Sequence, residues 1–226
     1  MTPQPNHIAL FDLDHTLLPV DSDYEWAAFL IDLGIVDATA HKQKNDLFYE
    51  QYKAGTLDIF EFLRFQLKPL SQHDKTQLDA WLMQFMQTRI APQIKPRAKA
   101  LVEHHLARQD LCILITATNE FVTAPIARAF GIEHLIAVQL ESKDGRYTGA
   151  PSGTPSFREG KITRLTAFLE DRGLALNQFA SSTFYSDSQN DLPLLERVTH
   201  PVAVNPDPTL RAKATAAGWP VLELFA

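Results

Sequence analysis

Short apolar runs alternate with helix-length amphipathic stretches along most of this chain, and this alternation limits the folds open to it. The runs at Ile8–Phe11 and Leu111–Thr116 are apolar almost throughout, as strands buried on both faces are. Strands that alternate with helices predict a parallel sheet with helices on both faces. We therefore expect an α/β fold with a Rossmann-like, doubly wound parallel sheet. Further strands are expected at 135–140, 183–186, 202–205 and 221–224, and helices at 96–108, 121–130, 160–172, 192–198 and 208–217.

The segment from Asp21 to Ala91 interrupts this alternation. It shows helical periodicity and no convincing strand, and Gly34, Gly55 and Pro69 separate its parts. The periodicity predicts helices at 24–33, 38–54, 58–67 and 72–88.

An insertion of about 70 residues between the first strand and its crossover helix is far longer than an ordinary loop. We interpret residues 21–91 as an inserted, all-helical cap subdomain, and residues 1–20 and 92–226 as the α/β core. Such a cap would lie above the carboxyl ends of the strands, where ligands bind in open α/β sheets.

The composition excludes several kinds of partner. The formal net charge of -6 comes from 27 Asp and Glu against 21 Lys and Arg, so the overall field repels nucleic acids and anionic membranes. The lone Cys112 excludes an internal disulfide and a cysteine-based zinc site. No apolar segment approaches the ~20 residues that cross a bilayer, and the N-terminus carries no signal-peptide pattern. We expect a cytoplasmic monomer or homodimer whose partner is a small molecule.

Two pairs of aspartates follow strands of the predicted sheet. Asp12 and Asp14 come directly after the first strand, and Asp187 and Asp191 come after the fourth. Either pair taken alone could serve only to cap a helix or to form a turn. Because the carboxyl ends of parallel strands meet at one edge, we expect all four carboxylates to converge.

Converging carboxylates repel one another unless a cation joins them, and Mg²⁺ is suited to a few carboxylate oxygens, waters and a phosphate. With the metal bound, Asp12 can attack phosphorus, while Asp14 can protonate a leaving alcohol and then deprotonate water. Thr116, at the end of the second long strand, offers a hydroxyl donor, and Lys161, at the start of a helix, offers a positive charge. The pattern predicts phosphoryl transfer through an aspartyl phosphate.

The motifs FDLDHT, ITAT, GK and YSDSQND, in this order, resemble those of the haloacid dehalogenase superfamily of phosphohydrolases. The helical insertion resembles the C1-type cap of the phosphoserine phosphatase-like branch, subfamily IB. The resemblance implies that Asp12 is the nucleophile and Asp14 the acid/base, and that Thr116 and Lys161 bind phosphate. It further implies Mg²⁺ ligands or anchors at Asp12, Asp14 (through its backbone carbonyl), Asp187 and Asp191, and a phosphate or metal-water contact at Asn190.

The resemblance also suggests which residues recognise the substrate. Asp21 stands where the phosphoserine phosphatases carry an acid that meets the substrate's amino group, and Arg64 can pair with a substrate carboxylate. Phe65 and Gln66 stand where further basic residues are expected, so an amino-bearing ester without a carboxylate, such as histidinol phosphate, is open beside phosphoserine. The C-terminal part resembles a bacterial subgroup with members that act on histidinol phosphate. Asn119 either caps the following helix or contacts the substrate.

Two other functions could use the same nucleophile. A phosphotransferase would pass the phosphoryl group from Asp12 to an alcohol, and Asp14 serves either acceptor. A phospho-acceptor signalling module would keep an aspartyl phosphate for longer. The second acid at Asp14 and the helical insertion both argue against that module.

Overall fold

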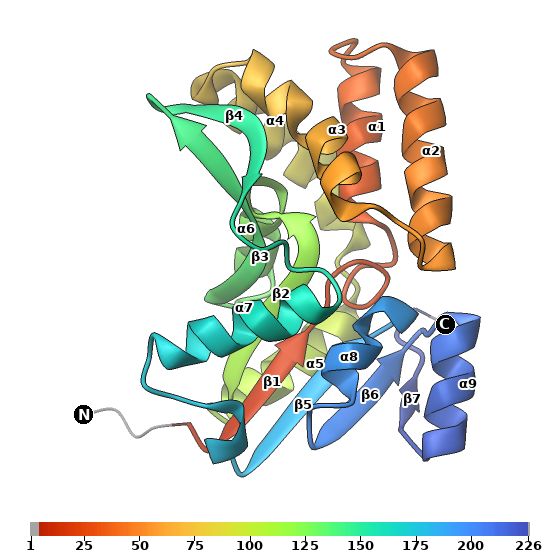
Figure 1. Cartoon of the computed structure of the whole chain (residues 1–226), viewed down its shortest axis with the longest axis vertical. Helices are drawn as coiled ribbons and strands as arrows, with labels where there is room; N and C mark the ends of the chain where they lie inside the picture. The colour runs from red at the N-terminus through yellow and green to blue at the C-terminus, as the bar shows by residue number, and fades with distance from the viewer. Residues whose placement is uncertain (1–4, 226) are drawn as a thin grey trace.

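The computed structural model describes residues 5–225, which contain a sheet of seven strands flanked by helices (Figure 1). The strand order is β4-β3-β2-β1-β5-β6-β7, and every neighbouring pair is parallel except β3 with β4. In the central strand, Ile8 pairs with Leu111 of β2 and Ser182 of β5. The strands are β1 (His7–Phe11), β2 (Leu111–Asn119), β3 (His134–Lys143), β4 (Arg146–Ser152), β5 (Ser181–Ser186), β6 (His200–Val204) and β7 (Val221–Leu222).

Alternate residues of β1 face two separate hydrophobic clusters. Ala9 and Phe11 pack with α5 and α6, whereas Ile8 and Leu10 pack with α7, α8 and α9 on the other face. A strand buried on both faces has to be apolar at every position, which accounts for the unbroken run in the sequence. The doubly wound α/β prediction is therefore confirmed. The helices are α5 (Pro96–Ala107), α6 (Glu120–Ala129), α7 (Glu159–Glu170), α8 (Leu192–Leu195) and α9 (Pro208–Ala217).

Four helices lie beyond the carboxyl ends of the parallel strands, and we call them the cap (Figure 1). They are α1 (Ser22–Asp32), α2 (Ala38–Ala54), α3 (Ile59–Gln72) and α4 (Lys75–Phe85), and a π-helical turn over Met86–Ile90 follows them. Sequence periodicity predicted a helix for each of the four. Among the described residues, no helix is both long and apolar enough to cross a membrane.

Pro69 does not end a helix, contrary to the sequence prediction. It lies inside α3, where Leu67, Pro69 and Leu70 are all buried. This end of α3 packs against β4 so closely that a Cβ at Gly149 would lie 3.1 Å from the hydroxyl of Ser71. Burial of this apolar face offsets the hydrogen bond that a proline removes from a helix interior.

The β4 strand, which pairs with β3 as an antiparallel hairpin, was not predicted from the sequence. Its signal was the two-residue turn Asp144-Gly145, in which both residues have positive φ (51° and 77°) as a tight hairpin requires. The hairpin rises from the core beside α3 and α4 (Figure 1). Several predicted boundaries were also wrong: β2 extends to Asn119, β3 to Lys143 and α3 to Gln72, whereas α8 ends at Leu195.

Candidate active site

The first acidic motif lies in a tight turn at the end of β1. Asp12 continues the ladder by donating its N–H to the carbonyl of Tyr185 in β5, at 2.9 Å. The chain then turns around the carbonyl of Leu13, which accepts the backbone N–H groups of residues 16–18. This turn brings Asp12 and Asp14 to one cavity between the cap and the core.

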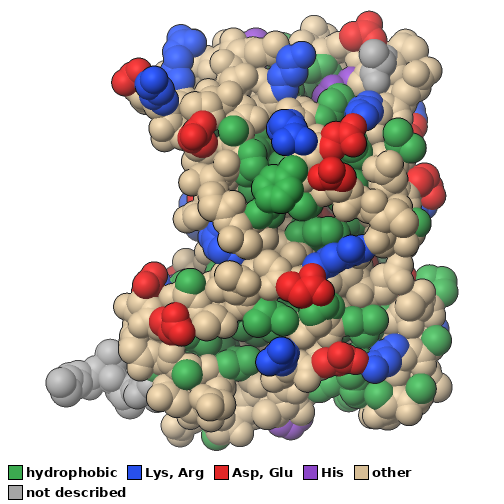
Figure 2. All heavy atoms as spheres, viewed as in Figure 1, with side chains coloured by type: hydrophobic (Ala, Val, Ile, Leu, Met, Phe, Trp, Pro, Cys, Tyr) green, Lys and Arg blue, Asp and Glu red, His purple; other side chains and the backbone are tan. Residues whose placement is uncertain are grey.

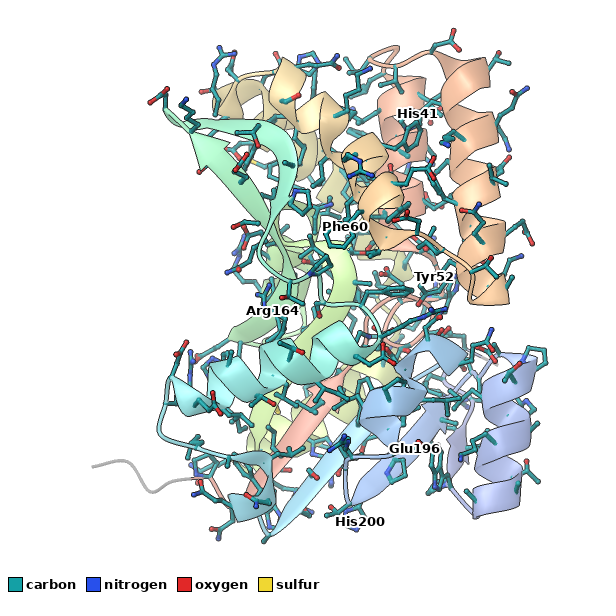
Figure 3. The ribbon with its side chains drawn as sticks, in the orientation of Figure 1. His41, Tyr52, Phe60, Arg164, Glu196 and His200 are labelled. Atoms are coloured by element: carbon teal, nitrogen blue, oxygen red, sulfur yellow. The ribbon has the colours of Figure 1, made fainter. Side chains whose placement is uncertain are left out.

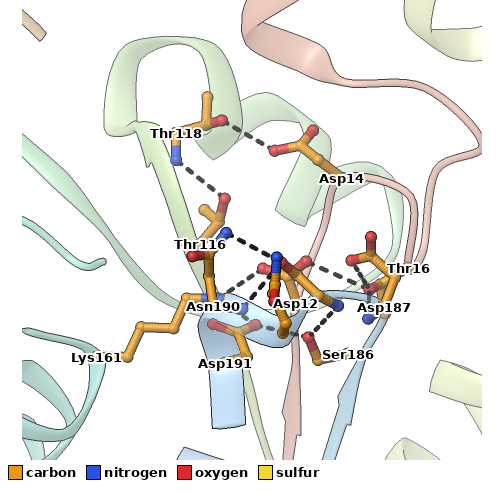
Figure 4. Close-up of polar contacts among 12 residues, drawn as sticks. Asp12, Asp14, Thr16, Thr116, Thr118, Lys161, Ser186, Asp187, Asn190 and Asp191 are labelled. Atoms are coloured by element: carbon orange, nitrogen blue, oxygen red, sulfur yellow. Dashed lines mark hydrogen bonds and ion pairs between the residues drawn. The ribbon is translucent and has the colours of Figure 1, made fainter. Parts of the chain in front are cut away.

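Lys161 forms ion pairs with two of the predicted carboxylates. Its Nζ lies 2.7 Å from Oδ1 of Asp12 and 2.7 Å from Oδ2 of Asp191 (Figure 4). The side chain is only 2% exposed, so neither pair is screened by water. Gly160 permits this placement, because a Cβ there would overlap the carbonyl oxygen of Pro155.

A hydroxyl group, that of Thr16, holds a further carboxylate, Asp187. Thr16 Oγ1 donates to Asp187 Oδ1 at 3.0 Å and lies 3.3 Å from Asp12 Oδ2, and it accepts the backbone N–H of Asp187 at 3.0 Å (Figure 4). Ser186 Oγ similarly donates to Asp191 Oδ2 at 2.7 Å. These contacts tie the end of β1 to the end of β5, and they bring together three of the four carboxylates that were expected to converge, Asp12, Asp187 and Asp191; the Asp14 carboxylate instead accepts hydrogen bonds from Ser22 and Thr118.

Lys161 thus pairs with two of these three buried carboxylates, and Asp187 is left with Thr16. Burial raises the pKa of Asp12, and the nearby lysine only partly offsets this. Burial and the charge of Asp12 raise the pKa of Asp187 well above its usual value, and burial raises that of Asp191 to about 6. Burial alone would lower the pKa of Lys161, but the two paired carboxylates raise it overall. The site carries excess negative charge and favours a second cation.

The oxygen atoms at this site fit Mg²⁺ better than they fit a metal ion whose ligands are all protein side chains. Within residues 5–225, no three His, Cys, Asp or Glu side chains form a ready group of metal ligands. Mg²⁺ does not require one, because it usually binds one or two carboxylates and keeps several waters. Asp12 and Asp187, bridged by Thr16, offer such carboxylates, and Asp14 offers a backbone carbonyl in the same turn. Asp191 faces Lys161 and Ser186.

Asp14 has a different environment from Asp12. Its Oδ1 accepts the backbone N–H of Ser22 at 2.7 Å, and its Oδ2 accepts the hydroxyl of Thr118 at 2.9 Å. Burial and the nearby charge of Asp21 raise the pKa of Asp14 to about 6. Asp14 can therefore gain and lose a proton near neutral pH. Thr118 was not predicted from the sequence, although threonines two apart at a strand end point the same way.

Thr116 is the other hydroxyl of this strand end. It lies within β2, where the register with β3 shifts, and its Oγ1 accepts the backbone N–H of Thr118 at 3.1 Å. No described residue accepts its hydroxyl proton, and Thr116 lines the cavity. Its hydroxyl is available as a donor to a ligand.

The predicted substrate-binding residues divide between the cavity and other places. Asp21 caps α1 by accepting the N–H of Tyr24 at 2.8 Å, and it also lines the cavity. Arg64 lies on the exposed side of α3 and does not line the cavity. Asn119 caps α6, and its Nδ2 donates to Oδ1 of Asp23 at 3.1 Å. Sequence reasoning missed Asp23, which is the second residue of α1 and lines the cavity.

Asn190 connects the core to the cap. Its Nδ2 donates to the carbonyl of Tyr52 at 3.0 Å, and its Oδ1 accepts from Nε of Arg158 at 3.1 Å. Arg158 also donates to the carbonyl of Gly55, and Gln189 donates to the carbonyl of Lys53 at 2.7 Å. These hydrogen bonds satisfy carbonyl groups at the C-terminal end of α2 and join this end of the cap to the core.

The cavity is acidic near the strand ends and aromatic toward the cap. None of its lining residues among those described is Lys or Arg. On the outside, the molecule narrows between cap and core, and hydrophobic side chains lie in this waist (Figure 2). Phe60, which is 47% exposed, lies at the same level (Figure 3). The lining consists of Asp12, Asp14, Thr116, Ala117, Thr118 and Phe157 from the core, and Asp21, Asp23, Tyr24, Asn45, Phe48, Tyr49, Tyr52, Leu57, Ile59, Phe62 and Gln66 from the cap region.

Comparisons with known proteins concern the sequence and the fold of this chain. Residues 9–196 match the model of the haloacid dehalogenase-like hydrolases. The chain is 48% identical over 217 residues to a histidinol-phosphatase of Neisseria meningitidis, and the match covers 96% of this chain and 98% of that protein.

Solved structures show the same fold. A protein of unknown function from Bordetella pertussis is 53% identical, with a TM-score of 0.93 over 98% of this chain and 100% of that one. A substrate-bound phosphoserine phosphatase shares 16% identity and a TM-score of 0.69 over 97% of this chain and 93% of its own. At that identity the likeness concerns the fold alone.

Proposed function

Because the chain is a phosphatase that belongs to the haloacid dehalogenase-like hydrolase family, we propose that it hydrolyses a small amino-bearing phosphomonoester through a phosphoryl group on Asp12. The observation that carries this proposal is the pairing of two carboxylates of unlike environment in one turn. Asp12 is paired with Lys161, whereas Asp14 has a pKa raised to about 6 by burial and by Asp21. One is suited to attack and the other to proton transfer.

We infer the following sequence of bond changes. A carboxylate oxygen of Asp12 forms a bond to phosphorus while the bond from phosphorus to the alcohol oxygen breaks, and Asp14 donates its proton to that oxygen. Asp14 then takes a proton from water, whose oxygen attacks phosphorus and releases inorganic phosphate from Asp12. The hydroxyl of Thr116 donates to a phosphoryl oxygen, and Lys161 keeps Asp12 in place and offsets negative charge.

We propose Mg²⁺ as the cofactor, held by Asp12, Asp187 and the carbonyl of Asp14, with Asp191 as an anchor. When bound, the ion neutralises charge on the phosphoryl group. The support for it is the excess of buried negative charge, since Lys161 pairs with Asp12 and Asp191 only, and Asp187 lies close to both of these carboxylates.

The cavity favours an amine and disfavours a carboxylate on the substrate. Asp21 and Asp23 both line it, and burial together with the charges of Asp21 and Asp14 raises the pKa of Asp23 well above its usual value. An ammonium group would relieve this. No lysine or arginine of the described lining could pair with a carboxylate. We therefore propose histidinol phosphate, rather than phosphoserine, as the substrate. The Neisseria relative is named a histidinol-phosphatase.

The test is phosphate release from histidinol phosphate, phosphoserine and phosphoethanolamine, with Mg²⁺ and with EDTA. We expect hydrolysis that needs Mg²⁺ and that is at least about tenfold more efficient for histidinol phosphate than for phosphoserine. Asp12→Asn should lower the rate by about 10³-fold or more. The control is Asp144→Asn in the exposed β3–β4 turn. An Asp12→Asn protein as active as this control would refute the mechanism.

A further inference from the structure

A buried pair of amide side chains lies in the cap and lines the cavity. Gln66 of α3 donates from Nε2 to Oδ1 of Asn45 in α2, at 3.1 Å, and the two residues are 5% and 4% exposed. Neither residue has a part in the phosphoryl-transfer steps. Buried polar side chains normally have hydrogen-bond partners for their polar atoms, so an unpaired atom on such a side chain calls for a partner.

This amide pair has unused hydrogen-bonding groups. Gln66 Oε1 and Asn45 Nδ2 make no hydrogen bond with any residue in the described part of the chain. One is an acceptor and the other a donor. A neutral imidazole likewise carries one N–H donor and one acceptor nitrogen, so the two sets are complementary.

The pair also lies at a suitable distance from the carboxylates. On α2, Tyr52 lies at the core end, where burial and the charges of Asp12, Asp187 and Asp191 raise its pKa (Figure 3). Asn45 is seven residues earlier on the same helix, which is about 10 Å along its axis. In histidinol phosphate, an oxygen and three carbons separate phosphorus from the ring, and the amine is on the middle of these carbons. Asp21 and Asp23 line the same cavity as Asp12, at the phosphate end, and as the amide pair, at the ring end.

Aromatic side chains line the cavity near the amide pair. Phe48, buried and on α2, contacts Phe62 of α3 in an edge-to-face arrangement with ring centroids 5.4 Å apart. Tyr49 lines the same cavity one residue later. Aromatic faces and edges of this kind stack favourably on a planar ring.

We propose that Asn45 and Gln66 are specificity-determining residues that recognise a planar nitrogen heterocycle at the end of the substrate opposite its phosphate, the imidazole ring in histidinol phosphate. The proposal rests on the proposed phosphatase function. It assigns the amine to Asp21 and Asp23 and the ring to the amide pair. The alternative is that the amide pair only joins α2 to α3.

Three phosphate esters separate these two roles: histidinol phosphate, phenylalaninol phosphate, which has the ring without its nitrogens, and alaninol phosphate, which has no ring. Wild-type protein should favour histidinol phosphate over phenylalaninol phosphate by about 10- to 100-fold in kcat/KM. Gln66→Met should reduce this preference about tenfold or more, mainly through KM, while changing kcat/KM for alaninol phosphate by about threefold at most. The control is Gln43→Met, on the exposed side of α2.

A double variant separates recognition from stability. Gln66→Met alone leaves Asn45 unpaired, whereas Asn45→Leu with Gln66→Met replaces both polar partners and should recover part of the melting temperature. The proposal expects the double variant to keep the lost preference. Equal losses on all three esters, or recovery of the preference with the melting temperature, would overturn it. A wild-type protein that hydrolyses the esters without favouring imidazole refutes this inference alone, whereas no hydrolysis of any ester refutes the proposed function.

Discussion

Replacing Lys161 by Met tests whether the charge balance of the site is as the structure indicates. Lys161 is 2% exposed and pairs with Asp12 and Asp191 at 2.7 Å each. Removing one partner of a buried ion pair leaves an uncompensated charge and costs about 3–5 kcal/mol. In EDTA at pH 7.5, we expect Lys161→Met to lower the free energy of unfolding by this amount.

The loss should depend on pH. A carboxyl group whose folded-state pKa is raised binds more protons in the folded than in the unfolded state, so its stabilising effect is present at low pH and is lost as pH rises through the folded pKa. Burial raises the pKa of Asp12 and brings that of Asp191 to about 6, and removing the lysine raises both further. Lowering the pH from 7.5 to 5 shifts both groups toward the protonated form, so the deficit of the variant should shrink by about 1 kcal/mol or more.

Urea denaturation at the two pH values measures both effects. Lys213→Met is the matched control, because Lys213 pairs with Glu196 at 2.6 Å on the surface, with 41% and 51% of the two side chains exposed. That pair should contribute at most about 1 kcal/mol at either pH. The reasoning is wrong if Lys161→Met costs no more than this control, or if its cost is the same at pH 5 and pH 7.5.

Three further results are expected. Asp14→Asn should slow turnover by about 10²- to 10⁴-fold and leave a phosphoryl group on Asp12 that intact-protein mass spectrometry detects; rapid loss of that group would contradict the assigned role. Gly160→Ala should destabilise the protein by about 1–3 kcal/mol in thermal melts and lower activity, because the added Cβ overlaps the Pro155 carbonyl; a variant with wild-type melting and rate would contradict the close approach. Mg²⁺ should raise the melting temperature more at pH 7.5 than at pH 5, because protons compete for Asp187, whose pKa burial and Asp12 raise; an equal shift at both values would show that the ion binds elsewhere.

The parts of the fold that sequence predicted best are those in which local pattern and burial agree. The strand at Ile8–Phe11 is apolar because both of its faces are covered, and an apolar run this short is typical of a central strand. The β4 strand has one exposed face and a mixture of polar and apolar side chains, so the only sequence signal for it is the Asp144-Gly145 turn that precedes it. The helix α3 continues through Pro69 because it packs against β4, and this tertiary contact leaves no signal in the local sequence.

The same distinction applies to the candidate site. The positions of Asp12, Asp187 and Asp191 directly after predicted strands were enough to predict that they lie together, because parallel strands end at a common edge. The cap contributes side chains from helices whose orientation is set by tertiary packing. Sequence therefore named Arg64, which lies outside the cavity, and did not name Asp23 or Asn45, which line it.

The central position of β1 has a consequence for how the chain is synthesised. Ile8 pairs with Leu111 and with Ser182, so this strand leaves the ribosome long before either neighbour exists. At about 5–20 residues per second, the segment that completes its pairing follows after roughly 10 to 35 seconds. Until β2 and then β5 have been made, one or both edges of this strand, which is apolar from Ile8 to Phe11, stay unpaired, whereas the cap helices, made next and rich in local contacts, can already form. Nascent chains should therefore depend on chaperones until β5 is complete, and truncations that end before it should aggregate.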